Sequence, residues 1–338
     1  MDHWCWVLID ESGLLYPSRK RTQDSNEDFP AILEGMSHLD RRAFLAVGAA
    51  SGLPVVSPKT WTLDPAKPGH TKNTKFAINI EMWRFGKRTR AERIRKVAEL
   101  GFQFVEFWGR PNEREIQDLR AACEETGVKI TQFTGFGGWA WQGAICNPKS
   151  EDRNHTKFVE EIKSSCAVAK ALDIPMMTII CGNEVPEVSL DAMHNSVIKG
   201  LKRAAPVCED QNVMMICEPM NTRVDHRGHC FYGSEHPVRI CREVDSPMCK
   251  LNWDVYHMQI MEGDLCRRLR EGWDQVGYIQ IADNPGRQEP GTGEIAYWRV
   301  YQELKALGYN KPVGVEANPS GPEHEAAVRL AESDNWST

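Results

Sequence analysis

The polarity of the chain alternates regularly from about residue 75 onward. Short apolar runs rich in β-branched and aromatic residues, such as Phe104–Trp108 and Met176–Cys181, are each followed by a longer stretch with apolar residues at helical spacing. The runs predict strands and the stretches predict helices. The predicted strands cover residues 76–83, 104–108, 128–133, 176–181, 213–219, 250–255, 276–282 and 313–316, and the predicted helices cover residues 88–100, 112–126, 156–172, 190–209, 237–244, 265–273, 297–307 and 322–331.

Eight such strand–helix units occupy residues 76–333, close to the ~250 residues typical of a (β/α)8 barrel. A doubly wound open sheet shows a similar alternation. However, no GxGxxG or GxxxxGK[ST] motif follows any predicted strand, which argues against the nucleotide-binding forms of that fold. No linker interrupts the pattern. We therefore predict an α/β protein whose single catalytic domain, residues 76–333, is a TIM barrel.

The residues before the first predicted strand lack this alternation. The segment Asp40-Arg41-Arg42-Ala43-Phe44-Leu45 resembles a twin-arginine export signal, and a short, weakly apolar stretch follows it at residues 46–56. We interpret residues 1–57 as a signal and N-terminal extension outside the fold, and residues 58–75 as a linker. Export to the periplasm is the favoured localisation, with the cytoplasm as the alternative.

Composition narrows the classes of partner. The chain is 338 residues long, 41% hydrophobic and 26% charged, with a net charge of −6. It has no basic block, which argues against general nucleic-acid binding. No apolar run reaches the ~18–20 residues of a membrane-spanning helix. The 11 Cys include no CxxC pair and lie mostly in apolar runs, which is typical of buried, reduced thiols. We expect a small-molecule substrate and leave a homo-oligomer open.

Polar residues end four consecutive predicted strands. They are Glu218, Asp254, Gln280 and Glu316. In a barrel the carboxyl ends of the strands converge, so these side chains should meet. A single Asp or Glu at a strand end is usually a cap, but carboxylates that converge repel one another unless a cation holds them. An all-oxygen set without His or Cys suits Mg²⁺ or Mn²⁺ better than zinc. We therefore predict a divalent metal site built from these four residues.

The segments around these residues resemble hydroxypyruvate isomerases of the xylose-isomerase-like barrel group. The resemblance covers about residues 76–333 and is strongest from Asp254 to Ile295. Around residues 134–141 the sequence departs from the usual pattern, since those isomerases often carry a His at the end of strand three, and substrate identity is left open there. The matching segments are EPMN (218–221), DVYHMQIMEG (254–263), QIADNPGR (280–287), EPGTGEI (289–295) and GVE (314–316).

The resemblance implies an isomerase that interconverts hydroxypyruvate and 2-hydroxy-3-oxopropanoate (tartronate semialdehyde) through an enediolate. It implies that Glu218 and Glu316 are the catalytic pair, one removing a proton and the other moving it on the facing side. The cation held by the four strand-end residues would polarise the carbonyl and stabilise the enediolate oxygens.

Further residues are candidates for substrate binding, each with a structural alternative. His257 matches a His that hydrogen-bonds a substrate oxygen in related epimerases, or makes a loop hydrogen bond. Arg287 is the first choice for a substrate carboxylate and Arg223 the second. Glu106 ends the second predicted strand and contacts either the substrate or a loop. In the Gly/Trp-rich segment 135–143, the tryptophans either cover the pocket or pack.

Other functions remain open. A ketose 3-epimerase or an isomerase acting on a larger sugar or a four-carbon keto acid would use the same glutamates, although the epimerases usually have a His where Gln280 stands. A metal-dependent abasic-site endonuclease would need a His-rich zinc site and a basic face. A non-catalytic sugar-binding barrel is the alternative from another class.

Overall fold

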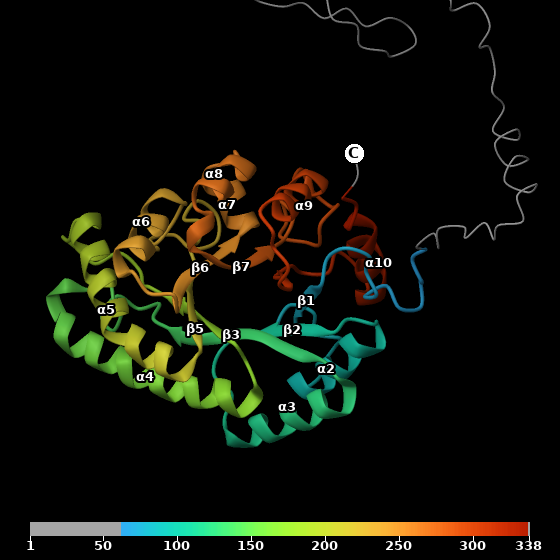
Figure 1. Ribbon diagram of the computed structural model, residues 1–338, viewed down its shortest axis with the longest axis horizontal. Helices are drawn as coiled ribbons and strands as arrows, with labels where there is room; N and C mark the ends of the chain where they lie inside the picture. Colours follow the sequence, from blue (N-terminus) through green and yellow to red (C-terminus); the bar gives the residue numbers. More distant parts are fainter. Residues whose placement is uncertain (1–61, 337–338) are drawn as a thin grey trace, which may run out of the picture. The chain divides into compact units, whose positions relative to one another are not determined.

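The computed structural model describes residues 62–336, which form a closed barrel of eight parallel strands (Figure 1). Each strand pairs with its neighbour in sequence, and β8 pairs with β1 to close the barrel. The predicted signal and extension, residues 1–57, lie outside the described residues. The strands are β1 (Phe76–Asn79), β2 (Phe104–Phe107), β3 (Lys129–Gly137), β4 (Met176–Ile180), β5 (Met214–Cys217), β6 (Cys249–Asp254), β7 (Val276–Ile281) and β8 (Val313–Val315).

Helices connect the strands in the order that the sequence predicts, so the TIM barrel prediction is confirmed. Thr89 and Asn112 each form a capping box at a helix start, and Gly127 ends α3 in the left-handed conformation. The helices are α2 (Arg90–Glu99), α3 (Glu113–Thr126), α4 (Glu151–Leu172), α5 (Leu190–Gln211), α6 (Glu235–Val244), α7 (Val255–Met261), α8 (Leu265–Glu271), α9 (Tyr297–Ala306) and α10 (Glu323–Ser333), with 3₁₀ turns at Pro148–Ser150 and Trp273–Gln275.

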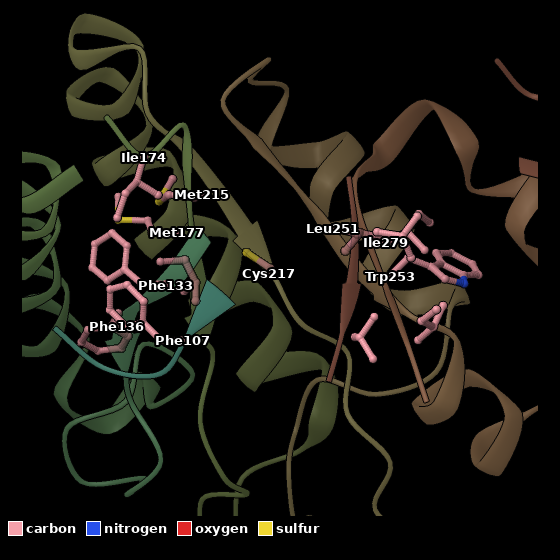
Figure 2. Close-up of a cluster of buried hydrophobic side chains, with 14 of the residues drawn as sticks. Phe107, Phe133, Phe136, Ile174, Met177, Met215, Cys217, Leu251, Trp253 and Ile279 are labelled. Carbon is pink, nitrogen blue, oxygen red and sulfur yellow. The ribbon is translucent and has the colours of Figure 1, made fainter. Parts of the chain in front are cut away.

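Alternate residues of each strand enter different packing layers. Figure 2 shows a cluster of buried side chains that includes Phe133, Met177 and Met215. The residues next to the two methionines, Met176 and Ile216, belong to a separate cluster inside the barrel. This period of two aims every second side chain at the barrel interior, where the polar strand-end residues continue the same rows.

The cysteines and the hydropathy of the helices also follow the polarity pattern of the sequence. Ten cysteines lie among the described residues; all are free thiols, and all but Cys123 and Cys266 are buried. This agrees with the prediction of reduced, buried thiols for the part of the chain that is described. No helix between residues 62 and 336 is long and apolar enough to cross a bilayer.

The two described ends of the chain meet beside β1. The Asp334 carboxylate, just after α10, accepts hydrogen bonds from the Asn73 backbone N–H (2.7 Å) and from the Thr74 hydroxyl (2.6 Å). The indole of Trp336 donates to the same carboxylate at 3.0 Å. Side-chain hydrogen bonds therefore join the segment that enters the first strand to the segment that leaves the last helix.

Candidate active site

Three of the four residues predicted to form a metal site lie together at the carboxyl ends of the strands. Glu218 follows β5, Asp254 ends β6 and Glu316 follows β8. His257, in the first turn of α7, joins them. One ligand atom from each of these four buried residues lies within 4.8 Å of all the others. The barrel thus converges on three carboxylates and one imidazole, which we call the carboxylate cluster.

The start of α7 positions two members of this cluster. Asp254 is the N-cap of α7, and its Oδ1 accepts a hydrogen bond from the Tyr256 backbone N–H at 2.8 Å. The first helical turn then brings His257 Nε2 to 3.6 Å from Asp254 Oδ2 and to 3.5 Å from Glu218 Oε1. A single residue therefore begins a helix and contributes a carboxylate to the site.

The protonation of His257 follows from its neighbour Asn221. Asn221 Oδ1 accepts from the backbone N–H groups of Val224 and Asp225, each at 3.0 Å, which fixes the orientation of the amide. Its Nδ2 then donates to His257 Nδ1 at 2.7 Å. In a neutral imidazole this assigns the proton to Nε2, the nitrogen that faces Glu218 and Asp254. Burial lowers the pKa of His257 well below its usual value, and the Arg287 charge lowers it further.

Arg287 extends into the carboxylate cluster from the loop after β7. Its Nη2 donates to Glu316 Oε2 at 2.6 Å and to Asp254 Oδ2 at 3.3 Å, and it lies 3.3 Å from His257 Nε2. The guanidinium also lies over the Tyr256 ring, 4.9 Å from its centroid. The structure therefore places Arg287 at the site, with two of the protein's own carboxylates as partners.

Gln280 and Glu106 form a polar layer directly below the cluster. Gln280 Oε1 accepts from Asn252 at 2.6 Å, and its Nε2 donates to Glu106 Oε1 at 2.7 Å. Glu106 also accepts from the Tyr278 hydroxyl at 2.9 Å. A Cβ at Gly314 would collide with the Glu106 carboxylate, so glycine makes room for this layer. A metal ion bound by Gln280 would use the second lone pair of its oxygen.

Arg223 lies away from the cluster. Its side chain is exposed, and it donates to the backbone carbonyl of Ile260 at 2.9 Å. Glu106 is buried in the polar layer and does not line the cavity described below. Both residues were predicted to bind substrate, and both assignments stay predictions.

Two residues that the sequence did not single out contact the cluster. The Trp108 indole, just after β2, donates to Glu316 Oε1 at 2.6 Å, and the Asn79 amide at the end of β1 lies 3.4 Å from the same oxygen. The signal in the sequence is their place at the ends of apolar strands, the same criterion that identified Glu218. From the sequence alone, a tryptophan at the end of a strand suggests only packing, because its hydrogen-bond acceptor is not visible there.

The electrostatics of the cluster suit a cation. Burial raises the pKa of Glu218 well above its usual range, and the charges of Glu316 and Asp254 raise it further. Burial raises the pKa of Asp254 to about 7, although the Arg287 guanidinium opposes the shift. Three carboxylates face one guanidinium, so the cluster takes up either protons or a cation. The oxygen-rich donor set fits a hard divalent ion.

A cavity of about 560 Å³ opens beside the cluster. Glu218, Arg287 and Glu316 line one wall. Most of the rest of the lining comes from β3, β4, α4 and the residues that follow β2 and β3, and it includes Trp108 and Trp139, which are 41% and 39% exposed. Trp108 joins this side to the cluster through its hydrogen bond to Glu316. Its other members on that side are Gly109, Arg110, Gln132, Thr134, Gly135, Phe136, Gly137, Lys157, Glu161, Thr178 and Ile180.

The tryptophans of segment 135–143 differ in their surroundings. Trp139 lines the cavity and stacks on His226, with ring centroids 5.1 Å apart. Trp141 is partly buried and packs against the hydrophobic core. Trp139 therefore contributes to the mouth of the cavity, whereas Trp141 is a packing residue.

Comparison with known proteins identifies one protein family and relatives named as isomerases. The family model described as xylose isomerase-like TIM barrel matches residues 94–333. Hydroxypyruvate isomerase from Escherichia coli K12 is 30% identical over 248 residues, which are 72% of this chain and 93% of that protein. A 2-oxo-tetronate isomerase from Cupriavidus necator is 29% identical over 248 residues, with the same coverage of 72% and 93%.

A solved structure shares the architecture. The crystal structure of a family 2 AP endonuclease from Brucella melitensis superposes with a TM-score of 0.68 at 25% sequence identity. The match covers 77% of this chain and 98% of that one.

Proposed function

This isomerase chain belongs to the xylose isomerase-like TIM barrel family, and from that premise we propose that it interconverts hydroxypyruvate and 2-hydroxy-3-oxopropanoate. The observation that carries the proposal is the placement of Glu218 and Glu316 in one buried cluster, on a cavity wall, at the carboxyl ends of the strands. The naming of relatives as hydroxypyruvate isomerases and 2-oxo-tetronate isomerases supports a small keto acid as substrate.

The reaction needs proton transfer and no net oxidation. One glutamate removes a proton from the hydroxymethyl carbon of hydroxypyruvate, which gives an enediolate. A proton is then returned to the neighbouring carbon, and the proton of the original hydroxyl moves to the former carbonyl oxygen. The carbon that lost its proton becomes the aldehyde, and its neighbour carries the new hydroxyl. Burial raises the pKa of Glu218 and so makes this carboxylate a stronger base than an exposed glutamate, whereas a cation bound to it would lower the pKa. His257 Nε2–H faces the same space and donates to a substrate oxygen.

We assign the cation to Glu218, Asp254, Gln280 and Glu316, with Mg²⁺ or Mn²⁺ as the expected ion. When bound, such an ion polarises the substrate carbonyl and offsets negative charge in the enediolate. His257 is a poorer ligand because Asn221 assigns the proton to Nε2, the nitrogen that faces the carboxylates. Arg287 orients Glu316 and Asp254 through its hydrogen bonds.

The test is the replacement of each catalytic carboxylate by its amide. Glu218→Gln and Glu316→Gln should each lower the exchange of deuterium from heavy water into hydroxypyruvate by about 100- to 10,000-fold, because an amide cannot accept the proton. Proton NMR measures the exchange, and thermal unfolding checks that the variants fold.

Glu161→Gln is the matched control, because Glu161 lines the same cavity but pairs with Arg110 at 2.7 Å. It should keep exchange within a few-fold of the unaltered protein. Near-normal exchange in either of the other two variants contradicts the paired-glutamate mechanism.

A four-carbon keto acid is the second candidate substrate. A cavity of about 560 Å³ is larger than a three-carbon anion needs, and relatives from three bacteria are named 2-oxo-tetronate isomerase. Turnover of hydroxypyruvate, 2-oxo-tetronate, fructose and psicose should be compared under one condition. Faster turnover of a neutral hexose would favour the epimerase alternative instead.

A further inference from the structure

The β3 side of the cavity holds a hydrogen-bond donor that is left free by the protein and opens into the cavity. Gln132 on β3 lines the cavity and is 1% exposed. Its Oε1 accepts a hydrogen bond from the Thr178 hydroxyl at 2.9 Å, which fixes the amide. The Gln132 Nε2 has no hydrogen-bond partner among residues 62–336. Because the side chain is almost fully buried and its amide is fixed, this N–H is directed at whatever occupies the cavity.

An irregularity in β3 brings Gln132 to the cavity. Val105 of β2 pairs with Ile130, and Phe107 pairs with Phe133, so β3 carries one extra residue between these pairs. Next to Gln132, the Thr131 hydroxyl contacts the Tyr278 hydroxyl inside the barrel at 2.9 Å. A bulge of this kind lets two successive side chains face the same side, a common device beside active sites.

Thr134 continues the wall toward the cavity mouth. It lines the cavity and is half-buried. Its hydroxyl has no hydrogen-bond partner within the described part of the chain. The wall therefore presents an amide N–H and a hydroxyl side by side along one strand.

Lys157 adds an uncompensated positive charge to this wall. The cavity is lined by three Arg or Lys side chains, of which Arg110 pairs with Glu161 at 2.7 Å and Arg287 pairs with Glu316 at 2.6 Å. Lys157, on α4, forms no ion pair with any carboxylate between residues 62 and 336. The donor-rich wall thus carries the cation that remains available to a ligand.

We propose that this wall is the carboxylate subsite of the enzyme. The Gln132 amide and the Thr134 hydroxyl donate hydrogen bonds to the carboxylate of the substrate, and the Lys157 ammonium supplies the opposite charge. The inference rests on the proposed function and deepens it, because it makes the substrate a keto acid and separates it from a neutral ketose. It assigns the carboxylate to a different wall from Arg287, which the sequence suggested for this role.

The test compares ligands that differ only in the carboxylate. D-glycerate and glycerol are unreactive analogues in which a carboxylate replaces a hydroxymethyl group, and their binding to the full chain is measured by NMR titration with Mn²⁺ replaced by Mg²⁺ to avoid line broadening. Hydroxypyruvate and dihydroxyacetone are the corresponding pair of substrates, and deuterium exchange into each of them is measured.

Two variants probe the wall. Gln132→Glu keeps an oxygen for Thr178 and replaces the donor nitrogen by an anionic oxygen, and it should weaken glycerate binding by about 10- to 100-fold. Lys157→Gln should weaken it by about 2- to 5-fold, since an exposed charge is screened by water. Glycerol binding should change by less than about 2-fold in both. Lys170→Gln, on the same helix but outside the cavity, is the control.

The outcomes separate the subsite from the reaction. A glycerate preference that falls in both wall variants and persists in Lys170→Gln supports the subsite. An unchanged preference in both, or no preference in the unaltered protein, overturns it; Lys157→Gln alone decides if Gln132→Glu fails to fold. A preference that behaves as expected, without deuterium exchange into hydroxypyruvate, overturns the proposed function and leaves the subsite standing.

Discussion

His229 shows how one buried group contributes to the pH dependence of the stability of this protein. It is fully buried, and neither ring nitrogen has a hydrogen-bond partner in the structure of residues 62–336. Burial, with a smaller contribution from His226, lowers the pKa of His229 to about 3. An unfolded histidine titrates near pH ~6.5. Between these values the unfolded chain binds one more proton, so the free energy of unfolding decreases as the pH falls.

His229→Leu should remove this contribution. The slope of unfolding free energy against pH, between about pH 6.5 and 4, should become shallower by up to ~1.4 kcal/mol per pH unit. At pH 7 the variant should be as stable as the unaltered protein or more stable, because two unpartnered nitrogens leave the core. Urea unfolding at several pH values measures both effects. His70→Gln, at an exposed position, should leave the slope unchanged, and an identical slope in His229→Leu contradicts the assignment.

Asp254 is the residue at which the proposed metal site can be removed. Asp254→Ala deletes one carboxylate of the cluster and the N-cap of α7. We expect the unaltered chain to bind one divalent ion, and this variant to lose that ion with a loss of stability of about 1 kcal/mol from the missing cap. Metal analysis and a Mn²⁺ titration measure binding.

The control for this metal experiment is Asp274→Ala, an exposed aspartate that pairs with Arg242 at 2.6 Å. It should bind the ion as the unaltered chain does. Full activity after exhaustive chelation would mean that the ion has no part in the reaction.

For single residues, the sequence predicted which polar side chains follow the strands, but it did not predict contacts between residues that are distant in the chain. Glu218, Asp254 and Glu316 converge because the period of two continues past each strand. The sequence also placed Arg287 near the strand-end residue Gln280, but it did not reveal the hydrogen bonds of Arg287 to Asp254 and Glu316. The contact from Trp108 to Glu316 joins residues that are 208 positions apart, and only closure of the barrel brings them together.

Among the elements, β3 and α7 depart most from the prediction. The sequence predicted a strand at residues 128–133 and a loop from residue 135, whereas β3 continues to Gly137 because pairing with β4 overrides the low strand propensity of its glycines. The α7 helix was not predicted: it spans only Val255–Met261 and follows β6 without a turn. Other boundaries agree within a few residues, since long stretches of clear period leave little choice.

Gly314 in β8 is the element-scale feature most open to a direct test. In Gly314→Ala the new methyl group would collide with Glu106 and lie 2.9 Å from the Tyr278 hydroxyl. We expect a loss of stability of about 1–3 kcal/mol from overpacking, and lower turnover because Gln280 rests on the displaced carboxylate. Thermal unfolding and kcat measure the two effects. Gly143→Ala, where nothing lies within 4 Å of the added Cβ, should be neutral; equal behaviour of both variants contradicts the crowding argument.

For the molecule as a whole, Asp334 is the side chain that joins the segment before β1 to the segment after α10. Asp334→Ala leaves the Asn73 N–H, the Thr74 hydroxyl and the Trp336 indole without their shared acceptor. The loss of stability should be about 2–4 kcal/mol. Asp334→Asn keeps one oxygen acceptor and should lose roughly half as much. Urea unfolding distinguishes the variants, and equal stability of all three proteins would show that barrel closure does not depend on this carboxylate.

The fold class could be predicted from the sequence because the barrel repeats one strand–helix unit, and the polarity pattern of that unit is clear in each repeat. The hydrogen bonds of Asp334 could not, because that residue follows the last helix and its partners precede the first strand. The cavity was beyond reach for the same reason: its walls come from strands that are far apart in the chain and become opposite only after the barrel closes.

The hydrogen bonds of Asp334 also make the barrel a candidate for circular permutation. With Asn73 and Trp336 already adjacent to the same carboxylate, a short peptide joining them would turn residues 73–336 into a continuous ring of strand–helix units. The ring could then be opened at an exposed loop on the face away from the cavity, for example at Asn310–Lys311 between α9 and β8. Every strand pair would survive such a cut. The same site would then form whichever strand–helix unit is synthesised first.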